Sequence, residues 1–276
     1  MPAGVVHHRA LAMASAAFAT ACLALACEPT VVIGTCSQAN AAGAGGEAGA
    51  TASSNDGSVG VPWSTGFENG MCDYFSQGGY CYARHDATME IVRSPVHSGQ
   101  FAAAFTVNGN ATNMTEDRSQ ARCVRQGKMP ESAYYGAWYF VPELHTSDTN
   151  WNLFHFLGGV SETDSHPLWD ISLANDSDGA LVLSVLNFIK NTHPPISGVP
   201  PIPIGSWFHI EIFLKRSATA NGEVTVLQDG VTALHQINLV TDDTDWGQWY
   251  VGNYARKLVP ALSTIYVDDI TIREGQ

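Results

Sequence analysis

Two arginines and a glutamine alternate along one short stretch of the chain in a way that could hold an anion. The stretch reads Arg118-Ser119-Gln120-Ala121-Arg122. In a strand, Arg118, Gln120 and Arg122 would point to one face, because successive side chains alternate between faces. Guanidinium groups on such a face suit a carboxylate, which they bind with two nitrogens. The alternative is an exposed edge strand whose basic residues discourage pairing with other chains.

A histidine among aromatic residues is the second candidate for chemistry. In the stretch from Trp151 to Phe156, strict alternation places Trp151, Leu153 and His155 on one face and Phe154 on the core face. An aromatic ring beside a histidine suits a sugar-binding cleft, since rings stack on pyranose faces. A structural histidine at a sheet surface is the equally weighted alternative.

Tyrosines and polar residues near the C-terminus form the third candidate. Tyr250 and Tyr254 flank a Gly-Asn pair, and Asn253 and Lys257 are polar neighbours that could contact a substrate. Tyrosines in a β-sandwich are as often simply part of the core.

These residues must be positioned by strands. Short runs of alternating apolar and polar residues recur after residue 61, separated by Gly, Pro, Asn and Asp, and no long stretch shows helical periodicity. We expect an all-β domain, a two-sheet antiparallel sandwich or jelly roll. The expected strands are Thr88–Arg93, Gln100–Val107, Arg118–Arg125, Ala133–Val141, Trp151–Leu157, Trp169–Leu173, Leu181–Asn187, Trp207–Lys215, Glu223–Gln228, Val231–Asn238 and Thr264–Arg273.

The N-terminus predicts export. Residues 1–27 have a basic start, an uncharged apolar run and small residues before Cys27, which is typical of a signal peptide. The ending Leu-Ala-Leu-Ala-Cys resembles a bacterial lipobox, so Cys27 would be lipidated and would anchor the protein at the cell envelope or surface; the alternative is an ordinary cleaved signal and a secreted protein. Residues 28–60, rich in Ala, Gly and Ser, predict a flexible tether. One domain, residues 61–276, remains.

Charge and cysteine content narrow the possible partners. From residue 61 onward the chain has 23 Asp and Glu against 12 Lys and Arg, which argues against nucleic acid and anionic lipid as partners. The cysteines left after lipidation are Cys36, Cys72, Cys81 and Cys123, which permit three pairings. A Gly-Gly turn between Cys72 and Cys81 favours that pair. Without Cys-x-x-Cys or His-x-x-x-His spacing, a zinc site is not expected.

Five segments of the domain look familiar: Gly66-Phe67-Glu68-Asn69-Gly70, Tyr134 to Pro142, Trp151 to Phe156, Pro203 to Glu211, and Tyr266-Val267-Asp268-Asp269-Ile270. They resemble the concanavalin A-like jelly rolls of polysaccharide lyases related to heparin lyase I and alginate lyases. The resemblance spans nearly the whole domain. It implies the fold, and it implies an acidic polysaccharide as the partner of a monomeric, cofactor-independent enzyme.

The resemblance also implies roles for the candidate residues. Uronate lyases neutralise a carboxylate, remove the neighbouring proton and expel the glycosidic oxygen. Arg122 and Gln120 would neutralise the carboxylate with help from Arg118, and His155 and Tyr254 would transfer protons. Trp151, Tyr250, Asn253 and Lys257 would contact the substrate. Two departures from the alginate-lyase pattern are Gln120 in place of Glu and Leu153 in place of Gln.

A structural calcium site is implied by the same resemblance. In similar jelly rolls an acid of the first strand and acids of the last strand hold Ca²⁺ with oxygen ligands. The matching residues are Glu68, Asp268 and Asp269. In a regular strand Asp268 and Asp269 would point to opposite faces, so both need not be ligands.

Two other functions compete with the lyase. A non-catalytic carbohydrate-binding or adhesion lipoprotein would need only the aromatic face, and would tolerate the loss of His155 and Tyr254. A glycoside hydrolase needs two closely spaced carboxylates, and the stretches around Asp164 and Asp170 lack that spacing. We therefore rank the lyase first, the binding protein second and the hydrolase third.

Overall fold

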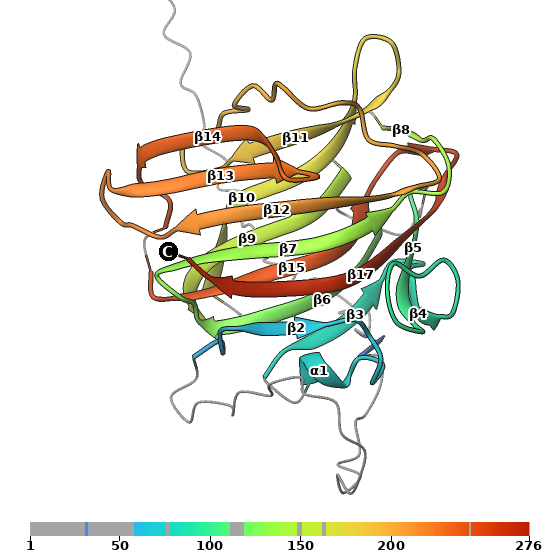
Figure 1. Ribbon diagram of the computed structural model, residues 1–276, viewed down its shortest axis with the longest axis horizontal. Coiled ribbons are helices and arrows are strands. Elements are labelled where there is room, and N and C mark those ends of the chain that lie inside the picture. Colours follow the sequence, from blue (N-terminus) through green and yellow to red (C-terminus); the bar gives the residue numbers. More distant parts are fainter. Residues whose placement is uncertain are drawn as a thin grey trace, which may run out of the picture.

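The computed structural model describes residues 31–32, 58–75, 78–110, 119–147, 151–161, 164–242 and 244–275 as two stacked antiparallel sheets (Figure 1). Sheet A has the order β1 (Val31–Val32), β3 (Tyr80–Arg84), β6 (Ser119–Lys128), β15 (Trp246–Ala255), β9 (Trp151–Ser161), β10 (Asp164–Asn175) and β11 (Leu181–Asn187). Sheet B has the order β14 (Val231–Leu239), β13 (Gly222–Gln228), β12 (Trp207–Lys215), β7 (Ser132–Phe140), β17 (Leu262–Glu274), β5 (Ala102–Asn108) and β4 (Thr88–Val92), with β2 (Trp63–Thr65) beside β17. The smaller elements are α1 (Cys72–Phe75), β8 (Thr146–Ser147) and β16 (Leu258–Val259).

Aromatic side chains fill the space between the sheets. Tyr135 of β7 makes edge contacts with Phe156 and Trp249 of sheet A, at 5.1 and 5.0 Å between ring centroids, and Tyr139 does the same with Phe154 at 5.5 Å. Edge-to-face packing at these distances adds to the free energy gained by burying the rings. The all-β two-sheet prediction is therefore confirmed.

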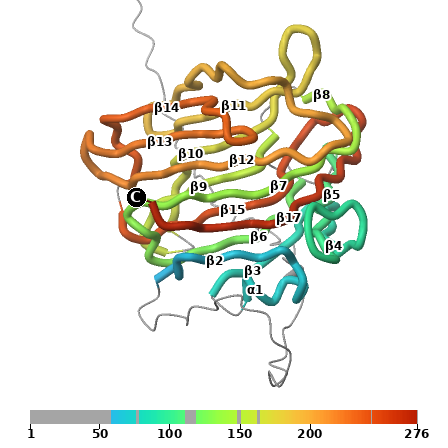
Figure 2. Tube along the Cα trace, viewed as in Figure 1, coloured from blue at the N-terminus to red at the C-terminus, as the bar shows by residue number. Residues whose placement is uncertain are grey.

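Long strands bring distant parts of the chain together. The last strand, β17, lies between β7 and β5, and the final described residues lie beside the start of β7 (Figure 2). Among the described residues, no helix is long and apolar enough to cross a membrane.

Of sheet A, the sequence analysis missed the two-residue strand β1, which falls within the expected tether, and two longer strands, β3 and β15. Both lie next to β6, on either side of it. Their outward side chains include Tyr80, Tyr82 and Tyr250, which are as apolar as the inward ones. The polar-apolar alternation that reveals a half-exposed strand is therefore absent from them.

The disulfide prediction was wrong. Cys81 pairs with Cys123, and Cys72 is disulfide-bonded elsewhere. The reason lies in the strand that was missed: β3 and β6 place Cys81 directly opposite Cys123. Both residues are fully buried in the core, so the bond joins the neighbouring strands β3 and β6 inside the sandwich.

Replacing both cysteines by alanine is expected to destabilise the domain by about 4 kcal/mol. The bond closes a loop with a sequence separation of 42, and loop-closure entropy of that length corresponds to this value. Urea unfolding of the double variant and the unmodified protein measures the difference. Equal midpoints would contradict the assignment, and peptide mapping without reductant provides an independent control of the pairing.

Candidate active site on sheet A

The outward face of sheet A brings together most of the predicted site. Strand register places four residues side by side across β6, β15, β9 and β10: Val124, Tyr250, His155 and Asp170. The imidazole of His155 meets the ring of Tyr250 edge-on at 5.7 Å between centroids.

A second row crosses the same four strands at the level of Tyr254. It consists of Gln120, Tyr254, Asn152 and Ser172. The hydroxyl of Tyr82 on β3 donates to Oε1 of Gln120 at 3.3 Å. This bond occupies the amide oxygen, so the amide nitrogen of Gln120 keeps its donors for another partner.

Arg122 lies between the two rows. Its guanidinium carbon is 3.8 Å from the ring centre of Tyr254 and 4.8 Å from that of Tyr250. Its register partner on β15 is Gly252, which has no side chain to fill the space between the tyrosines. Arg122 is only 7% exposed, and its Nη2 has no hydrogen-bond partner among the described residues. A buried donor without a partner costs free energy, and a bound carboxylate would satisfy it.

His155 is held by a buried carboxylate. Its Nδ1 forms an ion pair with Oδ1 of Asp170, and Nδ2 of Asn152 donates to Oδ2 of the same carboxylate. The side chains of His155 and Asp170 are 12% and 6% exposed. Of the predicted residues, the structure thus brings together Gln120, Arg122, His155, Tyr250 and Tyr254; Arg118 and Cys27 lie outside the described residues.

A β-bulge changes the face on which the β9 residues lie. Phe154 pairs with Ile171 of β10, but Asn152 pairs with the next residue, so Leu153 is extra. Asn152 and His155, three positions apart, therefore share a face. The prediction for Trp151 was wrong for the same reason: it is fully buried, and its indole nitrogen donates to Oδ1 of Asn253 at 2.7 Å.

Asn253 and Lys257 do not join the site. Asn253 is fully buried and donates to the carbonyl oxygens of Phe105 and Ser263 at 2.9 and 3.1 Å, so it connects sheet A to sheet B through the core. Lys257 lies after the end of β15 and lines a separate pocket with Thr146. Substrate contact by Asn253 is therefore ruled out by its burial, whereas substrate contact by Lys257 stays a prediction.

Sequence reasoning missed four residues of this face: Tyr82, Arg84, Asn152 and Asp170. Arg84 lies over the ring of Tyr82 with its guanidinium carbon 5.0 Å from the ring centre. The pattern Tyr80-x-Tyr82-x-Arg84 was a signal for an outward aromatic and basic face, but only once β3 is recognised as a strand. No local pattern marks Asn152 and Asp170, because the bulge and the β9–β10 pairing bring them to His155.

The three acids predicted to hold calcium converge on one loop. Oε1 of Glu68 accepts the backbone N–H groups of Gln100 and Phe101 at 2.8 and 3.1 Å. Oδ2 of Asp268 accepts the backbone N–H groups of His97 and Ser98 at 2.9 and 3.2 Å. The carboxylates therefore hold the loop itself.

Asp269 reaches the same loop as Asp268, contrary to the alternation expected for a strand. A register shift in β17 and a φ of 44° at Asp269 turn its side chain, so that it contacts Nδ1 of His97 at 2.6 Å and the hydroxyl of Ser98 at 2.8 Å. Among the described residues, no group of three or more His, Cys, Asp and Glu side chains is arranged to hold a metal ion. Calcium at this cluster stays a prediction.

Asp268 is expected to make stability depend on pH. Burial raises the pKa of Asp268 to about 6. The negative charge of Asp269 also raises this pKa, whereas hydrogen bonds from backbone N–H groups lower it. A carboxyl whose pKa is higher in the folded state stabilises the fold below pH about 4, and this contribution is lost as pH rises through about 6. The free energy of unfolding of the wild type, relative to Asp268→Asn, should fall between pH 4 and 7 in urea titrations.

A difference that is constant with pH would contradict this expectation. Melting curves at pH 7 with millimolar Ca²⁺ test the calcium prediction in the same two proteins. An ion bound by Asp268 raises the melting temperature of the wild type more than that of the variant.

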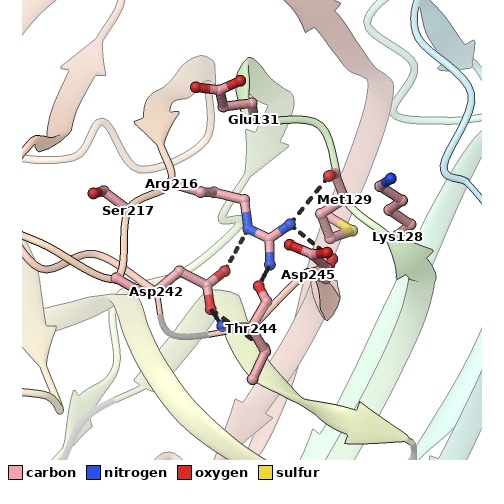
Figure 3. A pocket seen from close by; sticks show the side chains of 9 residues that line it. Lys128, Met129, Glu131, Arg216, Ser217, Asp242, Thr244 and Asp245 are labelled. Carbon is pink, nitrogen blue, oxygen red and sulfur yellow. Dashed lines mark hydrogen bonds and ion pairs between the residues drawn. The ribbon is translucent and has the colours of Figure 1, made fainter.

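A pocket of about 610 Å³ lies away from these residues, between the β6–β7 and β14–β15 connections, and Arg216 is its central side chain (Figure 3). Its Nε pairs with Asp242, its Nη1 donates to the carbonyls of Met129 and Asp245 at 3.0 and 2.9 Å, and its Nη2 donates to that of Thr244. Four of the five N–H groups of Arg216 are therefore occupied within the protein. The arginine stabilises the connections and is not available for a substrate in the way that Arg122 is.

An all-β sandwich with an arginine, a histidine and tyrosines on one face agrees with the family that the sequence matches. A family model described as "Polysaccharide lyase" matches residues 62–271, and the chain belongs to this family. No curated protein sequence matches the chain.

Solved structures share the fold at low identity. The chain is similar to an endo-β-1,4-glucuronan lyase from the fungus Trichoderma reesei, with 16% identity, a TM-score of 0.54, and coverage of 70% of this chain and 90% of that chain. It is also similar to alginate lyase Aly36B, solved as a double mutant with an alginate trisaccharide, with 12% identity, a TM-score of 0.52, and coverage of 78% of this chain and 98% of that chain. A third similar structure is an alginate lyase from Aplysia kurodai, with 11% identity, a TM-score of 0.52, and coverage of 77% of this chain and 98% of that chain.

Proposed function

We propose that this protein cleaves a uronate-containing polysaccharide by β-elimination. The observation that carries the proposal is the buried guanidinium of Arg122. Its Nη2 has no hydrogen-bond partner within the described part of the chain, and the guanidinium contacts Tyr254 and Tyr250, with His155 beside Tyr250. Membership of the polysaccharide lyase family supports the reaction class. The glucuronan and alginate lyases with the same fold support a uronate as the substrate class.

The chemistry needs an anion-binding group beside two proton carriers. Arg122, with the amide nitrogen of Gln120, binds the uronate carboxylate and stabilises the negative charge that develops on it. The C5–H bond breaks and its electrons form the C4=C5 double bond, while the C4–O bond breaks and its electrons stay on the glycosidic oxygen. His155 and Tyr254 transfer the two protons: one accepts the C5 proton, and the other protonates the leaving oxygen.

The subsites beside the reacting uronate would be lined by Arg84 and Tyr82. Arg84 is exposed at the end of β3, in register with Gln120. A second cation close to Arg122 suits a polymer with repeated carboxylates, which supports an acidic polysaccharide over a neutral one.

We further propose that the protein works outside the cytoplasm, anchored by lipid at Cys27. The Cys81–Cys123 disulfide supports an oxidising compartment. Palmitate labelling of the wild type and of Cys27→Ala in a bacterial host tests the anchor, and labelling that persists in the variant would contradict it.

Elimination is tested by ultraviolet absorbance, because only this reaction creates an unsaturated uronate. The purified protein is mixed separately with alginate, polyglucuronate, pectate and glycosaminoglycans. A rise in absorbance is expected with at least one polymer. In His155→Ala the rate of this rise is expected to fall by about 10²- to 10⁴-fold, the loss typical of removing a proton carrier. No rise with any polymer, together with retained migration shifts on affinity gels, would favour the non-catalytic binding protein.

A further inference from the structure

Asp170 is a buried carboxylate whose two oxygens have different partners. Oδ1 faces Nδ1 of His155, and Oδ2 accepts the amide of Asn152. The residue is 4% exposed, and within the described ranges its ion pairing involves His155 and no lysine or arginine. A buried carboxylate is costly unless it is paired and hydrogen-bonded, and His155 and Asn152 supply these two partners for Asp170.

The contact with Asp170 decides which nitrogen of His155 carries the proton. An ionised carboxylate only accepts hydrogen bonds, so Nδ1 of a neutral His155 must be the protonated nitrogen. Nε2 then keeps its lone pair. The ring centroids of Tyr250 and Phe188 lie 5.7 and 6.0 Å from the centroid of the His155 imidazole, in edge-to-face arrangements. These two rings limit how far the imidazole can turn.

We infer that Asp170 is a positioning residue that makes His155 the proton acceptor of the elimination, an inference that rests on the proposed function. Nε2 of His155 takes the C5 proton while Asp170 remains ionised and stabilises the imidazolium through Nδ1. The electron pair of the C5–H bond forms C4=C5, and the leaving oxygen takes its proton from Tyr254. His155 then gives its proton to water and Tyr254 takes a proton from water, which restores both side chains.

Asn152 makes this inference testable, because it fixes the orientation of the group at position 170. Its Nδ2 donates to Oδ2 of Asp170. In Asp170→Asn the remaining oxygen must face this donor, so the new amide nitrogen faces Nδ1 of His155. An amide nitrogen donates, and Nδ1 must then accept, which moves the proton to Nε2 and removes the lone pair that the reaction needs.

The experiment combines histidine ¹⁵N NMR with kinetics on the full-length protein. The neutral ring of His155, assigned by comparison with His155→Gln, is expected as the Nδ1–H tautomer in the wild type and as the Nε2–H tautomer in Asp170→Asn. The value of kcat on the cleaved polymer should fall by about 10³-fold with KM changed less than about threefold, as when a base is held in the wrong tautomer. Asp178 is an exposed carboxylate in the β10–β11 turn, and Asp178→Asn is the matched control. It should change neither the tautomer of His155 nor kcat.

The outcomes separate this inference from the proposed function. An unchanged tautomer in Asp170→Asn would overturn the role of Asp170, whatever the activity. A fall in kcat with an unchanged tautomer would point to a structural role and overturn it as well. If the tautomer changes but the protein cleaves none of the polymers, Asp170 does set the tautomer of His155, and the proposed lyase function is overturned.

Discussion

Replacing Arg122 by alanine is expected to lower kcat/KM on the cleaved polymer by about 10³-fold, the loss typical of removing a group that stabilises charge in the transition state. Nη2 of Arg122 is buried and has no partner among the residues that the structure describes, so the protein already bears the cost of desolvating it. A substrate carboxylate recovers that cost. Arg122→Lys keeps the charge but not the planar pair of nitrogens, so its kcat/KM should lie between those of the wild type and Arg122→Ala.

Initial rates of ultraviolet absorbance, over a range of polymer concentrations, measure the effect. Arg273→Ala is the matched control, because Arg273 is an arginine on sheet B that pairs with Glu211 and lies over Tyr134. The same loss of charge there should leave kcat/KM within about twofold. If Arg122→Ala and Arg273→Ala reduced activity equally, Arg122 would act through net charge and not through a bound carboxylate.

Removing the hydroxyl of Tyr254 is the second change with a large expected effect. Tyr254→Phe keeps the ring that packs on Arg122 at 3.8 Å, so the arginine should stay in place. If the hydroxyl supplies the proton to the leaving oxygen, kcat should fall by 10²- to 10⁴-fold with KM nearly unchanged.

Tyr250 provides the control for Tyr254. It lies on the same strand and also contacts Arg122, but its hydroxyl donates to Oε1 of Gln248 at 2.6 Å. Tyr250→Phe should therefore lower kcat by less than tenfold. Equal losses in the two variants would show that the hydroxyls support the arginine and its surroundings, and that neither is a specific proton donor.

Sequence patterns predicted the fold better than they predicted the site. Strands such as β11 and β13 alternate buried and half-exposed residues along their whole length, so their faces can be read directly. Arg122 and Gln120 lie on one face as expected, because β6 pairs with β15 without a register shift and its side chains keep alternating between faces. Tyr82 and Arg84 were missed, since the outward tyrosines of β3 are as apolar as Cys81 and Ala83 on its core face, which conceals the period of two.

Sequence patterns could not predict contacts between residues on strands that are distant in the sequence. Asn253 is polar but buried, because Trp151 and two backbone carbonyls satisfy its hydrogen bonds inside the core. Asp170 meets His155 only through the pairing of β10 with β9. Cys81 meets Cys123 only through the pairing of β3 with β6. Each depends on tertiary register, which no single segment specifies.

The extra residue Leu153 has a consequence for how this site is recognised in other sequences. If Leu153 were removed from the numbering, Asn152 would stand two positions before His155, where the alginate-lyase pattern has its amide residue. The chain thus has an amide on the same face as His155, although its spacing in the sequence departs from the pattern. A motif with fixed gaps would discard this protein, whereas one that allows a single insertion inside the strand would retain it.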